Sequence, residues 1–233
     1  MSEGLPVLLV PGLNCSPRLY APQIPALWRF GPVTVADHTR DDSIAAIARR
    51  ILAAAPPRFA LAGLSMGGYI ALEIVRQAAD RVAKLALLDT GPRADTPEAS
   101  EKRRVNIAAA QAGRFDEIID PQFPLYVHPG RANDRALKAD YLAMCHDVGP
   151  QAYVRQQTAI MHRVDSRPLL PTIRCPTLVL VGEQDEATPP ALSHEMATAI
   201  PGARLVTVPE CGHLATLERP EAVTQAMVGW LAA

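Results

Sequence analysis

The chain has 233 residues, of which 48% are hydrophobic and 20% charged, and its formal net charge is −1. This length and composition fit one globular domain with a substantial buried core. A charge so close to neutral argues against nucleic acid or an anionic membrane as the main partner, because both select for basic surfaces. No apolar run approaches the ~20 residues that a membrane-spanning helix needs. We expect a small-molecule substrate and predict no protein, nucleic-acid or membrane partner.

Six short, nearly continuous apolar runs alternate with longer helical patterns along the chain. Such runs suit strands that are covered on both faces, as in a parallel sheet. The runs are LPVLLV (5–10), VTVAD (33–37), RFALAG (58–63), KLALLD (84–89), TLVLVG (177–182) and RLVTVP (204–209). The main helix candidates are 43–55, 66–79, 192–200 and 220–233. The alternation predicts an α/β fold with a doubly wound, mainly parallel sheet.

The alternation is interrupted between residues 93 and 165, where the pattern is helical, polar and irregular. We predict a helical lid, inserted after the fourth strand, over the carboxyl edge of the sheet, where open α/β sheets bind ligands. The α/β core then comprises residues 1–92 and 166–233. Ordinary packing helices are the alternative.

The stretch FALAGLSMGGYIALEIV, residues 59–75, has the form strand, G-x-S-x-G, helix. This is typical of a nucleophile elbow, whose tight turn holds the serine in strained dihedral angles. Small residues are needed two positions before and after the serine, and Gly63 and Gly67 fill both places. Ser65 is therefore the candidate nucleophile, at a helix N-terminus that favours developing negative charge. The alternative is a structural serine in an ordinary turn.

A serine nucleophile of this type needs an acid and then a histidine later in the chain. His213 lies between the last predicted strand and the last predicted helix, and Gly212 lets the backbone turn its ring inward. We predict His213 as the general base. The other five histidines have no such context, and we expect them on the surface or in the lid: His38, His128, His146, His162 and His194.

Asp185 is the candidate acid. It lies in the loop after the fifth predicted strand, where a carboxylate can hold the imidazole in the required tautomer. Glu183 and Glu186 share that loop, and Asp89 ends the preceding strand, so these three remain alternatives.

Together, these motifs resemble the α/β-hydrolase fold superfamily, in its small bacterial esterase-like or MenH-like branch. The resemblance covers the chain outside the insertion, and its motifs are LVPGLN, GLSMGGY, PTLVLVGEQDEATPP and CGHLATLERPEAV. It places Ser65, Asp185 and His213 at the family's nucleophile, acid and base positions.

Two departures from the family pattern change the expectations. Relatives usually begin with a β-hairpin before the strand that corresponds to residues 5–10, so we expect a shortened sheet of six parallel strands. Many relatives also read His-Gly where this chain reads Pro11-Gly12. In relatives the next residue often donates its N–H to the oxyanion, which implies an oxyanion hole formed by the N–H groups of Leu13 and Met66. A plain strand-to-helix connection is the alternative.

The expected activity is hydrolysis of a small-molecule ester or related acyl compound through an acyl-enzyme. The resemblance leaves open a thioesterase, a C–C bond hydrolase, a MenH-like lyase, a perhydrolase and a non-catalytic small-molecule receptor. We expect no cofactor and no metal. Four scattered cysteines, without a C-x-x-C pair, and only four residues before the first predicted strand indicate a cytoplasmic protein without a signal peptide.

The substrate is not identified by the sequence. Weak candidates for the pocket wall are Tyr126, Tyr153 and Met161, together with Tyr20, Trp28 and Tyr69. Four arginines make the lid rich in cations, which favours either an anionic substrate or a solvated helix face. They are Arg103, Arg104, Arg155 and Arg163.

Overall fold

The computed structural model describes residues 4–233 and contains one six-stranded sheet in which all neighbouring strands run parallel. The strand order is β2-β1-β3-β4-β5-β6. The predicted fold class and the six parallel strands are therefore confirmed. The strands are β1 (Val7–Val10), β2 (Val33–Val35), β3 (Phe59–Leu64), β4 (Val82–Leu88), β5 (Thr177–Gly182) and β6 (Arg204–Val208).

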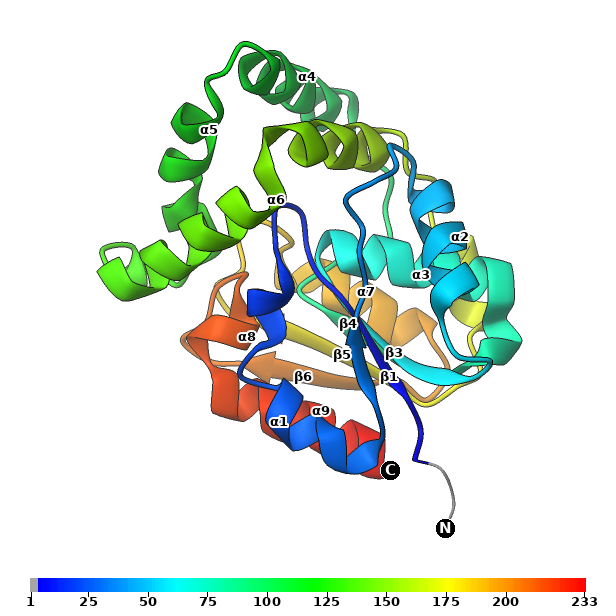
Figure 1. Ribbon diagram of the computed structural model, residues 1–233. Coiled ribbons are helices and arrows are strands. Elements are labelled where there is room, and N and C mark those ends of the chain that lie inside the picture. Colours follow the sequence, from blue (N-terminus) through cyan, green and yellow to red (C-terminus); the bar gives the residue numbers. More distant parts are fainter. Residues whose placement is uncertain (1–3) are drawn as a thin grey trace.

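Helices cover both faces of this sheet (Figure 1). On one face α1 and α9 pack against the sheet, and on the other face α2, α3 and α7 do so. Because both faces are covered, every residue of β3 and β5 is buried, which explains their unbroken apolar sequence. The core helices are α1 (Ile24–Leu27), α2 (Ile44–Ala54), α3 (Met66–Ala78), α7 (Pro190–Ala199), α8 (Ala215–Glu218) and α9 (Pro220–Ala232).

Helix α2 shows how the sequence sets these elements. Its first N–H groups have no partner within the helix, and the Ser43 hydroxyl accepts a hydrogen bond from the N–H of Ala46 at 3.1 Å. Ile44, Ile47 and Ile51 recur at helical spacing and are buried against the sheet. Capping and the apolar stripe therefore specify the same helix.

Strand β2 is two residues shorter than the predicted run 33–37. The N–H of Ala36 still donates to the carbonyl of Leu9 at 2.8 Å. At Asp37 a side-chain hydrogen bond replaces strand pairing, because the Asp37 carboxylate accepts from the N–H of Thr39 at 3.0 Å and starts a turn. The pattern of apolar residues alone does not reveal where such a side-chain hydrogen bond ends the strand.

Between β4 and β5 the chain forms a helical insertion of α4 (Pro97–Gln111), α5 (Phe115–Gln122) and α6 (Arg135–Met161). The insertion lies over the carboxyl edge of the sheet (Figure 1). Helix α6 is broken at Gly149, which has φ 77° and is followed by Pro150. Its role as a lid stays a prediction.

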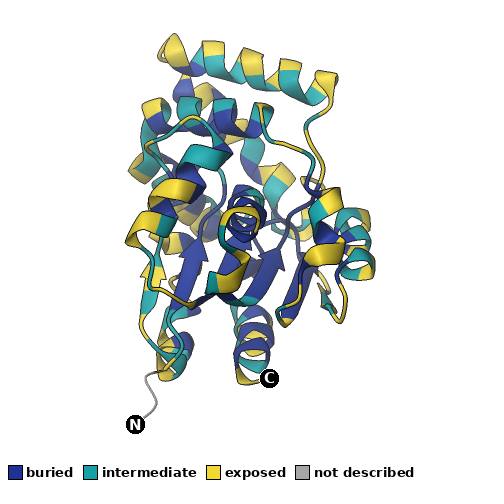
Figure 2. Ribbon diagram, turned by 90° about the vertical axis from the view of Figure 1, so that its right-hand side faces the viewer, coloured by how far each residue is buried: buried dark blue, intermediate teal, exposed yellow. Residues whose placement is uncertain are grey.

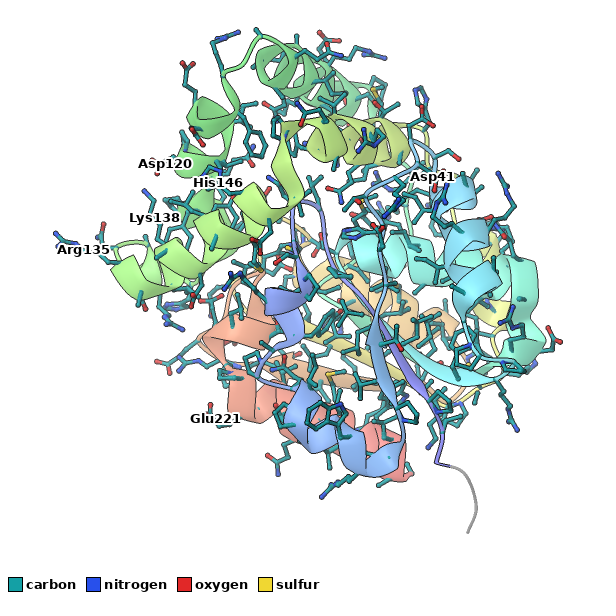
Figure 3. All side chains as sticks on the ribbon, in the orientation of Figure 1. Asp41, Asp120, Arg135, Lys138, His146 and Glu221 are labelled. Atoms are coloured by element: carbon teal, nitrogen blue, oxygen red, sulfur yellow. The ribbon has the colours of Figure 1, made fainter. Side chains whose placement is uncertain are left out.

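The outer side of the insertion is exposed, whereas strands β1, β3 and β5 are buried (Figure 2). Charged side chains of α5 and α6 point outward, among them Lys138 and Asp120, whose charged atoms lie 2.9 Å apart (Figure 3). Within residues 4–233, no helix combines the length and the apolar character that crossing a membrane requires.

Candidate active site

Ser65 lies in the turn between β3 and α3 and has φ 55° and ψ −116°. This positive φ is the strained conformation expected of a nucleophile elbow. A Cβ on Gly63 would lie 2.1 Å from the carbonyl oxygen of Gly67, and a Cβ on Gly67 would lie 2.0 Å from that of Val10. Both positions therefore require glycine.

Asp185 and His213 lie in the loops that follow β5 and β6, and their side chains meet. The Nδ1 atom of His213 lies 2.8 Å from Oδ2 of Asp185, and both residues are buried. The other oxygen of Asp185 accepts from the N–H groups of Ala187 and Thr188, each at 2.9 Å. The Thr188 hydroxyl adds a bond of 2.7 Å to Oδ2.

These contacts decide the charge of Asp185. Burial acts to raise its pKa, but the charge of His213 and the hydrogen bonds from His213 and Thr188 outweigh burial and hold the pKa below its ordinary value. An ionised carboxylate only accepts hydrogen bonds, so Nδ1 of His213 carries a hydrogen. The Nε2 atom is then the site on this ring that can take a proton.

Ser65 and His213 both line a cavity of about 180 Å³ at the carboxyl edge of the sheet. Among residues 4–233, no hydrogen bond joins the Ser65 hydroxyl to His213. Such contacts often tighten only when substrate binds. Other residues of the cavity wall include Leu13, Tyr69, Tyr126, Tyr141, Ile160 and Thr188.

The two predicted oxyanion donors lie beside Ser65. Leu13 lines the cavity, and Met66 is the first residue of α3, where N–H groups have no partner within the helix. In the described part of the chain, neither N–H makes a hydrogen bond to another residue. Gly12 packs so closely that a Cβ there would lie 3.3 Å from Cβ of Ser65. The geometry thus leaves two amide donors free next to the serine.

The alternative acids do not contact His213. Glu183 and Glu186 are exposed. Asp89 is buried and has φ 42°, and its Oδ1 accepts from the N–H of Gly182 at 2.8 Å. Burial, followed by the nearby charge of Asp185, raises the pKa of Asp89 well above its ordinary value. Asp89 is therefore a strand-end carboxyl bonded to the last amide of the neighbouring strand β5.

One histidine was placed wrongly by the sequence. His38 is neither on the surface nor in the insertion but is 2% exposed, with Nε2 2.9 Å from the carbonyl oxygen of Gly12. It follows β2 at the same edge of the sheet as the Gly12 loop. That position after a strand is the signal that could have identified it.

The weak candidates for substrate contact have different locations. Tyr126 lines the cavity, with its ring centroid 5.5 Å from that of His213. Tyr153 is buried, with its hydroxyl accepting from the Gln157 amide at 2.7 Å, and neither Tyr153 nor Met161 belongs to the cavity wall. Tyr141, Ile160 and Thr188 could not be identified from the sequence, because their positions depend on how the insertion and the loops pack.

Of the four arginines that the sequence analysis singled out in the insertion, Arg103 lines this cavity. Its Nε donates to Asp95 at 2.5 Å and its Nη1 to Gln157 at 2.6 Å. Asp95 is also paired with Arg163, so two guanidinium groups share one buried carboxylate. Asp95 therefore balances the charge of only one of these two guanidinium groups.

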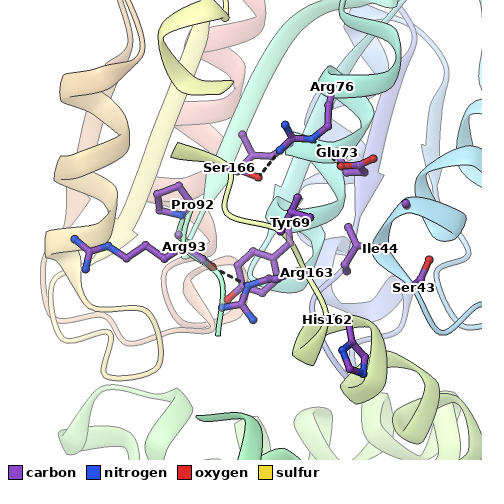
Figure 4. Close-up of a pocket in the computed structure, with 14 residues that line it drawn as sticks. Ser43, Ile44, Tyr69, Glu73, Arg76, Pro92, Arg93, His162, Arg163 and Ser166 are labelled. Atoms are coloured by element: carbon purple, nitrogen blue, oxygen red, sulfur yellow. Dashed lines mark hydrogen bonds and ion pairs between the residues drawn. The ribbon is translucent and has the colours of Figure 1, made fainter. Parts of the chain in front are cut away.

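A second cavity, of about 260 Å³, adjoins the first, and Tyr69 lines both (Figure 4). The Arg163 guanidinium lies 4.3 Å above the centre of the Tyr69 ring. The other arginines of this wall, Arg76 and Arg93, are paired with Glu73 and Glu195. Arg76 and Arg93 thus each have a carboxylate partner of their own, whereas Arg163 shares Asp95 with Arg103.

Comparison with known proteins identifies the family of this chain. The Alpha/beta hydrolase family model matches residues 6–226. The chain belongs to this family. A thermophilic esterase from Thermogutta terrifontis, solved with malate bound, is 32% identical with a TM-score of 0.90, and the match covers 99% of this chain and 90% of that one.

Two further matches support the same family. The enol-lactonase from Burkholderia xenovorans LB400 is 25% identical with a TM-score of 0.87, covering 100% of this chain and 93% of that one. A putative non-heme bromoperoxidase from Mycobacterium tuberculosis is 31% identical over 188 residues, which are 76% of this chain and 69% of the relative. This α/β hydrolase is thus an enzyme of the hydrolase type.

Proposed function

We propose that the protein is a serine hydrolase that cleaves small-molecule esters through an acyl-enzyme. Ser65 is the nucleophile, His213 the general base and Asp185 the acid that orients it. The observation that carries this proposal is the 2.8 Å bond between His213 and a buried, ionised Asp185, next to a cavity that contains the strained Ser65.

The reaction follows from this arrangement. His213 takes the hydroxyl proton of Ser65 on Nε2 while Oγ attacks the acyl carbon. The N–H groups of Leu13 and Met66 stabilise the oxyanion, and their fixed directions require no reorganisation during the step. The imidazolium then gives its proton to the leaving alcohol, which departs as the acyl-enzyme forms. A water molecule, deprotonated by His213, attacks the acyl-enzyme and releases the acid and Ser65.

Esters are the substrate class that two comparisons support. The esterase and the enol-lactonase both act on ester bonds, since a lactone is a cyclic ester. Both matches cover at least 99% of this chain. The cavity of about 180 Å³ favours a small acyl group.

The test is hydrolysis of p-nitrophenyl esters by the wild type and by Ser65→Ala. We expect kcat to fall by about 10⁵- to 10⁶-fold, because the covalent path is lost. Ser193→Ala is the control, since Ser193 is a serine buried in α7, away from the cavity. Equal rates for the wild type and Ser65→Ala would eliminate the proposal.

The nature of the cleaved bond is tested by a panel of matched ester, thioester and C–C substrates. We expect the highest kcat/KM for the ester. A higher value for the thioester or the C–C substrate would assign the same site to a thioesterase, a C–C hydrolase or a lyase. Stable capture of an intact ligand without turnover would instead indicate a receptor.

An anionic ester is a second candidate substrate, favoured by Arg103 in the cavity wall. A guanidinium can bind a substrate carboxylate with its remaining N–H groups. The test compares anionic and neutral esters of equal acyl length in the wild type and in Arg103→Gln. A preference for the anionic ester that Arg103→Gln abolishes supports this candidate, and equal kcat/KM values in the wild type contradict it.

A further inference from the structure

The carbonyl oxygen of Gly12 accepts two hydrogen bonds, from the N–H of Cys15 at 3.1 Å and from Nε2 of His38 at 2.9 Å. A peptide unit is planar, so the carbonyl of Gly12 and the N–H of Leu13 belong to one rigid group and point in opposite directions. Holding the carbonyl therefore fixes the direction of the Leu13 N–H, which is one of the two oxyanion donors in the proposed reaction.

The fold brings His38 to this carbonyl. β1 and β2 are parallel neighbours, so the loops after them leave the sheet at the same edge. The loop around His38 is itself held in place. Asp37 accepts from the N–H of Thr39 at 3.0 Å, and Arg155 of α6 donates to the carbonyl of Thr39 at 2.8 Å. These hydrogen bonds hold the loop that places His38 against the Gly12 carbonyl.

The burial of His38 determines its protonation. Burial lowers the pKa of this imidazole, and the opposing effects of the Gly12 bond and of Asp37 are smaller. A carbonyl oxygen can only accept, so Nε2 carries the hydrogen in the neutral ring. A donor on a carbonyl also polarises its peptide unit, and linked hydrogen bonds strengthen one another by about 10–30% each.

We propose that His38 is a positioning residue for the oxyanion hole, acting through the Gly12–Leu13 peptide. The proposal rests on the serine-hydrolase function above. His38 is absent from the cavity wall, so it acts without touching the substrate. Its Nε2–H holds the peptide so that the Leu13 N–H points at the forming oxyanion rather than at the ground-state carbonyl.

The test is a matched pair, His38→Gln and His38→Met. Glutamine can present an N–H the same number of bonds from Cβ as Nε2 of histidine, whereas methionine has a similar length but no donor. We expect His38→Met to lower kcat by about tenfold and to change KM by less than about twofold. This fall in kcat is smaller than the loss of about 100-fold or more that follows removal of an oxyanion donor itself. His38→Gln should recover most of that loss.

A trifluoromethyl ketone, which adds to the serine as a tetrahedral oxyanion, gives the second readout. Its inhibition constant should rise in His38→Met in proportion to the fall in kcat/KM, because a transition-state analogue uses the same donors. Equal kcat and inhibition constants for the Met and Gln variants, at equal melting temperatures, overturn the proposal. Ser65→Ala, assayed beside them, separates the two hypotheses. Full activity of Ser65→Ala removes the serine mechanism itself, whereas an inactive Ser65→Ala beside a fully active His38→Met removes only the role of His38.

Discussion

Three buried carboxyl groups at the carboxyl edge of the sheet have different partners, and these partners set their roles. Asp185 is bonded to His213 and to loop amides. Glu218 accepts from the N–H groups of His128 and Gly212, each at 2.8 Å, and so joins the insertion to the loop before His213. Asp89 accepts one hydrogen bond from Gly182, and its Oδ2 has no partner within the described residues. The charge of His213 and the hydrogen bonds to Asp185 outweigh burial and hold its pKa low, whereas burial raises the pKa of both Asp89 and Glu218.

Asp185→Asn should lower kcat by about 10⁴-fold, because an amide would hold the imidazole in the wrong tautomer. Ester hydrolysis measures this. Glu183→Gln and Glu186→Gln are matched controls from the same loop, and both side chains are exposed. A loss of similar size in either control, or none in Asp185→Asn, would move the acid away from Asp185.

Asp89→Asn should change how stability depends on pH. Because the pKa of Asp89 is raised in the folded state, the folded protein holds this proton at pH values where the unfolded chain has lost it. Stability is therefore lost as the pH rises from about 4 towards the folded pKa, by up to about 1.4 kcal/mol per pH unit.

Denaturant titration at several pH values checks this. The stability of Asp89→Asn relative to the wild type should increase with pH over that window, and asparagine tolerates the positive φ. Asp80→Asn, at an exposed position, is the control. A constant difference across the range contradicts a protonated Asp89.

At the scale of elements, the turn between β3 and α3 depends on close contact between the backbone at Gly67 and the backbone of strand β1. Gly67→Ala would place a Cβ 2.0 Å from the carbonyl oxygen of Val10 in the neighbouring strand, where no side chain can move aside. We expect it to lower the free energy of unfolding by about 3 kcal/mol or more.

Gly229→Ala is the matched control for that substitution. Gly229 lies in α9, and the nearest atom to its added Cβ is the end of the Arg204 side chain at 3.6 Å. This change should raise stability by up to about 1 kcal/mol, since alanine favours helix. Equal effects of the two substitutions in denaturant unfolding would contradict the close packing of the turn.

The elements were predictable because the information is local. Unbroken apolar runs mark β3 and β5, and the order of strands and helices implies a parallel sheet. The turn at Ser65 was also predictable, since its glycines stand at fixed spacing. The contact of His38 with Gly12 could not be predicted, because it joins two residues that are 26 positions apart and produces no periodic pattern in the sequence. The same holds for Tyr141 and Ile160, whose approach to the cavity depends on the break in α6.

At the scale of the whole molecule, the insertion and the core share the walls of the cavities. The N–H of Asn14 donates to Gln156 of α6 at 3.0 Å, and the N–H of Leu214 donates to the carbonyl of Tyr126 at 3.0 Å. The loops that hold Leu13 and His213 are thus each tied to the insertion. The size of the cavity beside Ser65 therefore depends on both parts of the chain.

Tyr69→Ala should join the cavities of about 180 and 260 Å³, because Tyr69 lines both. We expect kcat/KM for longer acyl chains to rise relative to acetate esters, by up to about fourfold for each methylene newly buried. Tyr69→Phe keeps the ring and is the control. An unchanged chain-length profile in Tyr69→Ala would show that this side chain does not separate the two cavities.

Labelling with a fluorophosphonate, mapped by mass spectrometry, tests the central claim most directly. The probe phosphorylates an activated serine, so it reports the nucleophile without knowledge of the substrate. We predict one adduct, on the peptide that contains Ser65, absent in Ser65→Ala and strongly reduced in Asp185→Asn. An adduct on another residue, or no adduct in a folded protein that still hydrolyses esters, would contradict the role of Ser65.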